Sequence, residues 1–205
     1  MKTETVSIFS SGEGREIALD LAERTGAYCQ LDNKSVLRLR LLSEELIELI
    51  RSFAANLQGD FWLETNDKDV EIHMKTVIPM DLKTRSELLA VSTSGENSAA
   101  KGIIGKIREM IALKTLPEDP DTKVMTEQAL GLISAGYEMS SYVAGAYSWS
   151  MSTYISKIDK ADFNIEEKNE AKDELEKSIV ANLADDVKVS IVNNDVEVTI
   201  FKSFA

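Results

Sequence analysis

The sequence contains few of the residues that build disulfide frameworks and zinc cages. Of its 205 residues, one is cysteine (Cys29) and one is histidine (His73). A lone cysteine cannot form an internal disulfide, and one cysteine with one histidine cannot supply the thiolate and imidazole ligands of a zinc cage. We therefore interpret Cys29 as a small core residue. Only three prolines and ten glycines occur, and we find no internal repeat or low-complexity tract.

Positive charge is also scarce. The chain has 23 Lys and Arg residues against 35 Asp and Glu residues, a net charge of -12. A protein that follows a phosphate backbone needs a basic surface to release counterions, and anionic lipid attracts basic segments. We therefore expect no nucleic-acid partner and no membrane partner, whereas a basic protein partner is compatible with the charge.

Long apolar runs are missing as well. The longest uncharged run, residues 139–156, contains several serines and three tyrosines, which makes it too polar for a membrane span. Residues 1–14 lack the apolar segment of a signal peptide. Apolar residues make up 43% of the chain and charged residues 28%, as in an ordinary globular protein with a sizeable core. We expect a cytoplasmic protein.

Local patterns predict a chain that begins and ends with strands. The apolar periodicity and the turn residues predict strands at 5–9, 61–65, 69–78 and in a hairpin over 185–204, and helices at 15–29, 35–57, 98–114, 123–158 and 166–184. This order predicts an α+β protein: a two-layer α/β sandwich whose mixed, mainly antiparallel sheet is covered by helices. Residues 81–165 are then a large helical insertion in a core formed by residues 1–80 and 166–205.

The same periodicities predict which side chains point inward. In the helix at 15–29 we expect Ile17, Leu21 and Tyr28 to face the core. In the strand at 69–78 the alternation of apolar and polar residues places His73 on the polar face, where an exposed histidine is expected.

The stretch LLSEELIELI, residues 41–50, places Glu44, Glu45 and Glu48 in an otherwise apolar helix. With the order of elements around it, this stretch resembles the N box of the GHKL or histidine kinase-like ATPases (Bergerat fold), most closely the small anti-sigma serine kinases. That box carries a glutamate and, four residues later, an asparagine. Glu44 takes the glutamate position, and Glu48 takes the position of the asparagine.

The resemblance covers roughly residues 4–80 and 168–202 and implies a site for ATP and Mg²⁺. It implies that Glu44 is the catalytic base and that Glu48 replaces the Mg²⁺ ligand, since a carboxylate suits this hard cation. The insertion would correspond to an enlarged ATP lid.

The glycine boxes of the family are altered here. In register with the first box, Thr76 stands where an aspartate accepts from the adenine amino group, and Ile78 and Met80 stand where glycines leave room for the base. The second box falls on residues 101–107 or, as we prefer, on residues 173–179, which contain no glycine and three acidic residues. Acidic side chains at that position repel phosphate.

These departures leave three functional hypotheses. In the first, the chain is a divergent member of the family that acts as a regulatory or protein-interaction module and has weakened or lost nucleotide binding. In the second, it is an active ATP-binding regulator or serine kinase of the anti-sigma type, with ATP and Mg²⁺ as cofactors. In the third, it is an unrelated α+β protein that self-associates, and the three glutamates are a solvated helix face.

The segment at residues 130–151 combines small residues with large aromatic ones. Such a segment is either a helix buried in a bundle or a surface for a partner protein or a homodimer, because aromatic residues are enriched at interfaces. The aromatic residues in question are Tyr137, Tyr142, Tyr147 and Trp149.

Overall fold

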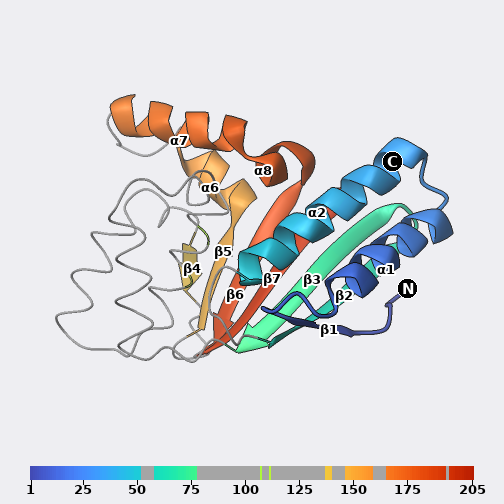
Figure 1. Cartoon of the computed structure of the whole chain (residues 1–205). Helices are drawn as coiled ribbons and strands as arrows, with labels where there is room; N and C mark the ends of the chain where they lie inside the picture. The colour runs from blue at the N-terminus through green and yellow to red at the C-terminus, as the bar shows by residue number, and fades with distance from the viewer. Residues whose placement is uncertain are drawn as a thin grey trace.

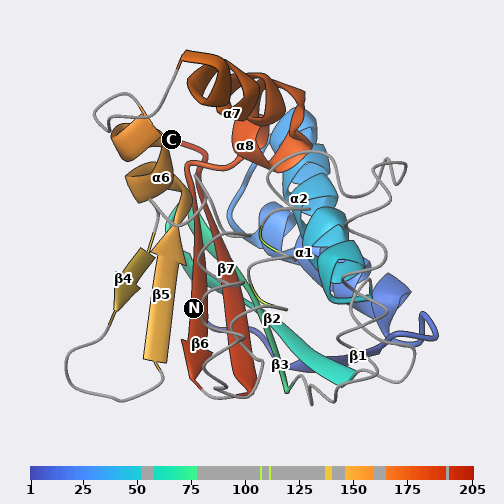
Figure 2. The same cartoon turned by 90° about the vertical axis from the view of Figure 1, so that its left-hand side faces the viewer.

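The fold is known from a computed structural model, which describes residues 1–51, 58–77, 107, 111, 137–139, 146–158, 165–192 and 194–205. A single antiparallel sheet forms one layer, and helices lie against one of its faces (Figures 1 and 2). The predicted α+β class and its two-layer arrangement are confirmed.

The described sheet has seven strands in the order β1-β2-β3-β7-β6-β5-β4. Each pair of neighbouring strands is antiparallel, so the described ladders include no parallel pair, whereas we expected a mixed sheet. The two predicted hairpins, β2–β3 and β6–β7, are confirmed and meet along β3 and β7 in the middle of the sheet. The strands are β1 Val6–Phe9, β2 Gln58–Asn66, β3 Asp69–Val77, β4 Tyr137–Met139, β5 Ala146–Ser150, β6 Asp186–Val192 and β7 Asp195–Ser203.

Five helices are described: α1 Arg15–Tyr28, α2 Asn33–Arg51, α6 Met151–Ile158, α7 Ile165–Lys177 and α8 Ile179–Leu183. The single helix predicted at 166–184 is interrupted at Ser178, whose hydroxyl oxygen accepts a hydrogen bond from the Ala181 N–H and caps α8. None of the helices in the described part of the chain has both the length and the apolar character that crossing a membrane requires.

Local chemistry fixes the ends of the first two helices. Gly14 precedes α1 with φ +83°, and a Cβ atom there would lie 2.1 Å from the main-chain oxygen of Ser7; only glycine fits. Asp32 precedes α2 and accepts a hydrogen bond from the Ser35 N–H (2.7 Å). This bond to the main chain, a side-chain bond from Ser35 and nearby Arg38 and Lys34 hold the pKa of Asp32 below its usual value.

The core lies between the helices and the sheet. In α2 the apolar residues at helical spacing from Leu39 to Leu49 are buried, as are the alternate residues of β3: Leu39, Leu42, Leu46, Leu49, Val70, Ile72 and Met74. In α1 the predicted inward residue Leu21 is buried, whereas Ile17 and Tyr28, which were also predicted inward, are 59% and 67% exposed. The buried face of α1 instead contains Ala18, Ala22 and Gly26, because these small residues let α1 lie close to α2.

The helix predicted at 123–158 is wrong over residues 137–139 and 146–150, which form β4 and β5. Strand β5 pairs with β6 over its whole length, from Ala146 opposite Val192 to Ser150 opposite Lys188. The exposed edge of β6 satisfies the main-chain groups of this segment, so sheet pairing overrides its helical periodicity. Within the described residues of 123–158, only α6 is helical as predicted. Of the helix predicted at 98–114, the structure describes Ile107 and Ile111, which are helical and buried as expected.

Candidate functional site

The two glutamates of the N-box-like stretch are bound by one arginine. The Arg15 guanidinium, at the start of α1, bonds the Glu44 carboxylate through Nη2, and its Nε lies 3.5 Å from Oε1 of Glu48. Its Nη1 also lies 2.6 Å from Oε1 of Glu16. The Arg15 side chain is 24% exposed, so the cluster lies partly within the α1–α2 interface. Helical spacing predicted that Glu44 and Glu48 share a face, but not their partner.

Arg40 does not pair with these glutamates. Arg40 stands four residues before Glu44 on α2, a spacing that allows an ion pair, yet it extends to α1, where Nη1 lies 2.6 Å from Glu23 and Nη2 3.7 Å from Glu16. Helix packing offered it carboxylates across the interface, which the spacing within one helix does not reveal.

Glu45 is the third carboxylate of the stretch, and it is half-buried. No hydrogen bond or ion pair of this side chain is found in the part of the chain that the structure describes. Burial raises the pKa of Glu45, and the negative charges of Glu44 and Glu48 raise it further. The stretch is therefore an acidic cluster in which Arg15 supplies the positive charge.

Thr76, the predicted adenine contact, is buried near the end of β3. Its hydroxyl donates a hydrogen bond to the main-chain oxygen of Gln58 (2.7 Å), across the β2–β3 pair. The structure thus brings Glu44 and Glu48 together and assigns Thr76 a contact within the sheet. Ile78 and Met80 lie outside the described residues.

The aromatic residues of the predicted partner surface differ in burial and lie in different elements. Trp149, on β5, is 1% exposed and packs against Tyr154 of α6 with ring centroids 5.9 Å apart. Tyr147 is half-buried. Trp149 is therefore a core residue. Tyr137 lies in β4, and Tyr142 lies outside the described residues.

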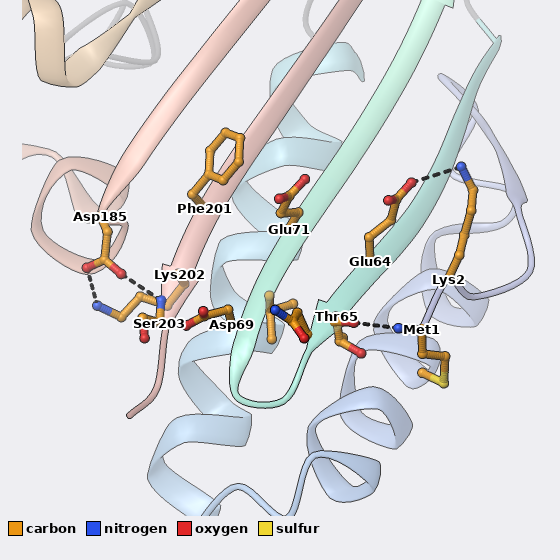
Figure 3. Close-up of a pocket in the computed structure, with 12 residues that line it drawn as sticks. Met1, Lys2, Glu64, Thr65, Asp69, Glu71, Asp185, Phe201, Lys202 and Ser203 are labelled. Atoms are coloured by element: carbon orange, nitrogen blue, oxygen red, sulfur yellow. Dashed lines mark hydrogen bonds and ion pairs between the residues drawn. The ribbon is translucent and has the colours of Figure 1, made fainter.

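A second candidate site lies on the sheet face away from the helices. A cavity of about 600 Å³ opens where β2, β3 and β7 end, and Glu64 and Glu71 lie side by side along it (Figure 3). Lys2 Nζ bonds Glu64 Oε1 (2.9 Å) and is 4.6 Å from the Trp62 ring centroid. Hydrogen bonds from Lys2 and Trp62 hold the pKa of Glu64 below its usual value.

The other end of this cavity carries a second ion pair. Asp185 accepts hydrogen bonds from Lys202 Nζ (2.7 Å) and the Ser203 N–H (2.6 Å) (Figure 3). Burial of Asp185 raises the pKa of its carboxyl, but these bonds outweigh that effect and leave the pKa lowered. Both lysines named here, Lys2 and Lys202, are therefore paired with carboxylates.

His73 lies on the same face beside Glu71 and is buried, which corrects the prediction of an exposed histidine. The Trp62 ring stacks on its imidazole at 4.8 Å and 5°, and this stacking removes the ring from solvent. The turn at Asp67 and Lys68 sets Trp62 opposite His73 and Glu64 opposite Glu71. The sequence carried that signal in the position of the turn, because a two-residue turn fixes every cross-strand pair.

Comparison of the chain with protein-family models, with curated proteins and with solved structures gave no match.

Proposed function

We propose that this chain is a regulatory module that binds other proteins and that its histidine kinase-like core has lost nucleotide chemistry. The observation that carries the proposal is the bonding of Glu44 and Glu48 to Arg15. In an active N box these two positions serve the attacking group and the metal. Here both carboxylates already have an intramolecular cation as partner, and Mg²⁺ would have to displace it.

The charge of the cluster also opposes a nucleotide. Glu45 stands beside Glu44 and Glu48, and each of the two raises its pKa. Glu44, Glu45 and Glu48 together outweigh the single charge of Arg15 and leave a net negative charge, and partly buried like charges repel one another. A triphosphate brought to this helix would meet that repulsion without a free cation to offset it among the residues just described.

Thr76 supports the same proposal. Its hydroxyl proton is used in the bond to Gln58, so only its uncharged oxygen could accept from an adenine amino group. A carboxylate at this position accepts a stronger hydrogen bond than a hydroxyl does. The adenine end of the site is therefore weakened together with the phosphate end.

Exposed apolar side chains on the two N-terminal helices support a role in protein binding. Ile17, Tyr28 and Leu37 are 59%, 67% and 65% exposed, and they belong to α1 and α2, the helical layer of the fold. Large apolar side chains that are exposed on one layer of a fold are available for contact with a partner protein. The single Cys29, free and buried, is compatible with the reducing cytoplasm, where we propose that the protein acts.

A phosphotransfer assay tests this proposal. Purified protein is incubated with Mg²⁺ and γ-labelled ATP, alone and with a generic serine-rich acceptor, beside the Glu44→Gln variant. We expect equal background release of phosphate from both proteins. Turnover in the wild type that the Glu44→Gln variant lacks would overturn the proposal and establish the active kinase instead.

A further inference from the structure

Two carboxylates face each other on adjacent strands of the helix-free face. The register places Glu64 on β2 directly opposite Glu71 on β3, an arrangement that destabilises a sheet when nothing neutralises it. Lys2 neutralises Glu64, whereas Glu71 lies 3.3 Å from a ring nitrogen of His73. A positive charge beside Glu71 would therefore stabilise this pair.

His73 presents an unsatisfied nitrogen at that place. Its side chain is 10% exposed, and its Nε2 atom is buried without a hydrogen-bond partner. Its other nitrogen, Nδ1, lies 3.2 Å from Oε1 of Glu197 and 3.2 Å from Oγ1 of Thr199. With the ring proton on Nδ1, where Glu197 can accept it, the neutral imidazole has a lone pair on Nε2 that faces the Glu71 carboxylate.

We propose that His73, Glu71 and Glu64 form a binding site for one divalent transition-metal ion, with Zn²⁺ as the best-matched ion. Their ligand atoms all lie within 4.8 Å of one another. An ion here would satisfy the orphaned Nε2 and offset the paired carboxylates in one step. The site lies on the opposite side of the sheet from Arg15 and Glu44, so this inference is independent of the proposed function.

The geometry suits zinc. Zinc bonds to imidazole nitrogen and carboxylate oxygen at about 2.0–2.2 Å, so two ligand atoms at the tetrahedral angle are about 3.3–3.5 Å apart. The 3.3 Å between His73 Nε2 and Glu71 Oε2 matches that edge. Glu64 completes the set by a rotation of its side chain toward His73. One imidazole with two carboxylates also excludes the soft ions that prefer thiolates.

The surrounding residues already hold the His73 ring in place. Glu197 and Thr199 fix the His73 ring through Nδ1, which is the usual support of a metal-bound histidine. Trp62 stacks on the ring and donates from Nε1 to Oε1 of Glu64 (2.9 Å). Glu64 and Glu71 also border the cavity of Figure 3, which gives an ion a path from solvent and leaves room for a further ligand on it.

Calorimetric titration of the chelator-treated protein with Zn²⁺ tests this inference. We expect one ion per chain with a micromolar or lower dissociation constant. Glu71→Gln keeps the shape of the side chain, and Glu197→Gln removes only the support of Nδ1. Loss of such a supporting group weakens metal binding about 10–100-fold, and we expect loss of Glu71 or, in His73→Asn, of the imidazole to weaken it more. Asp60→Asn, on the same strand face, is the matched control and should bind as the wild type does.

Tryptophan fluorescence reports metal binding at the same site and requires no enzymatic activity. Trp62 contacts His73, so Cu²⁺ or Ni²⁺ at this place should quench its emission, and the quenching should be lost in Trp62→Phe and reversed by excess Zn²⁺. Three results would overturn the inference: no saturable Zn²⁺ binding, binding that Glu71→Gln and His73→Asn leave unchanged, or equal weakening in Asp60→Asn.

Discussion

The Arg15 guanidinium bonds the Glu44 carboxylate across the α1–α2 interface, 29 residues along the chain. Glu48 lies near the same guanidinium, so one cation holds both residues that the nucleotide chemistry of an N box would require. The contact has a structural consequence as well, because it joins the first turn of α1 to the middle of α2.

Replacing this cation should destabilise the fold. Arg15→Ala leaves the partly buried Glu44 without this partner and removes one contact of Glu48, and we expect a loss of about 1 kcal/mol in the free energy of unfolding. Arg24→Ala is the control on the same helix, since Arg24 is 58% exposed and pairs with Asp20; its cost should stay below about 0.5 kcal/mol. Urea denaturation measures both. Equal costs for the two variants would contradict the role of Arg15.

The acidic cluster should make stability depend on pH. Burial and its two neighbours raise the pKa of Glu45 in the folded state, so the folded protein binds this proton more tightly than the unfolded chain does. The corresponding stability is fully present below the ordinary glutamate pKa and is lost as pH rises through the folded pKa.

Glu45→Gln removes the carboxylate whose ionisation lowers the stability of the folded protein. Above the raised pKa the variant should be more stable than the wild type by about a few tenths of a kcal/mol, because solvent screens a half-exposed carboxylate, and the difference should vanish in acid. Glu44→Gln should instead destabilise the protein at neutral pH, since it breaks the bond to Arg15. Thermal unfolding between acid and neutral pH distinguishes the two, and a destabilising Glu45→Gln at neutral pH would refute this reading of the cluster.

Trp149 should behave as a core residue. Its ring is 1% exposed, so Trp149→Ala should cost about 3–5 kcal/mol of stability. In the Trp62→Phe background it is the single tryptophan, since the chain has two. Its emission should then be blue-shifted and protected from acrylamide. Emission typical of a water-exposed indole would show instead that β5 presents Trp149 to a partner.

Gly14 should not tolerate a side chain. Gly14→Ala forces φ +83° on alanine and places its Cβ 2.1 Å from the Ser7 oxygen, so we expect a loss of about 3 kcal/mol or more. Gly26→Ala is the control, because Gly26 is helical without a positive φ and its new Cβ would lie 3.0 Å from a Val36 methyl group rather than against a main-chain oxygen. There the gain in helix propensity, about 1 kcal/mol, offsets much of the contact. Guanidinium unfolding of both variants measures the difference.

The two hairpins and the long helix α2 could be predicted because their signals are local. A two-residue turn at Asp67 and Lys68 fixes the pairs of β2 and β3, and the apolar stripe from Leu39 to Leu49 alone defines the buried face of α2. The helix–sheet arrangement then follows, since each apolar face has to be covered.

The predictions that were wrong concern segments whose structure depends on residues far away in the sequence. Residues 146–150 have small and aromatic residues that suit a helix or a strand, and the free edge of β6 decides for the strand. Ile17 and Tyr28 were expected inside, but the close approach of α1 to α2 requires alanine and glycine on that face.

In the candidate site, too, local spacing predicted some features and packing between elements set the others. Helical spacing predicted that Glu44 and Glu48 would share one face, whereas their partner Arg15 comes from another helix and is set by packing. His73 was expected in solvent because alternation reports only the face of a strand. Its burial comes from the Trp62 ring stacked upon it, which is a property of the cross-strand pair.

Calorimetric titration of the purified protein with ATP, with and without Mg²⁺, tests the central claim most directly. If Arg15 holds Glu44 and Glu48 and the acidic cluster repels phosphate, no saturable heat of binding should appear up to millimolar ATP in either condition. Saturable Mg²⁺-dependent binding that Glu44→Gln or Glu48→Gln abolishes, while both variants stay folded, would contradict the account.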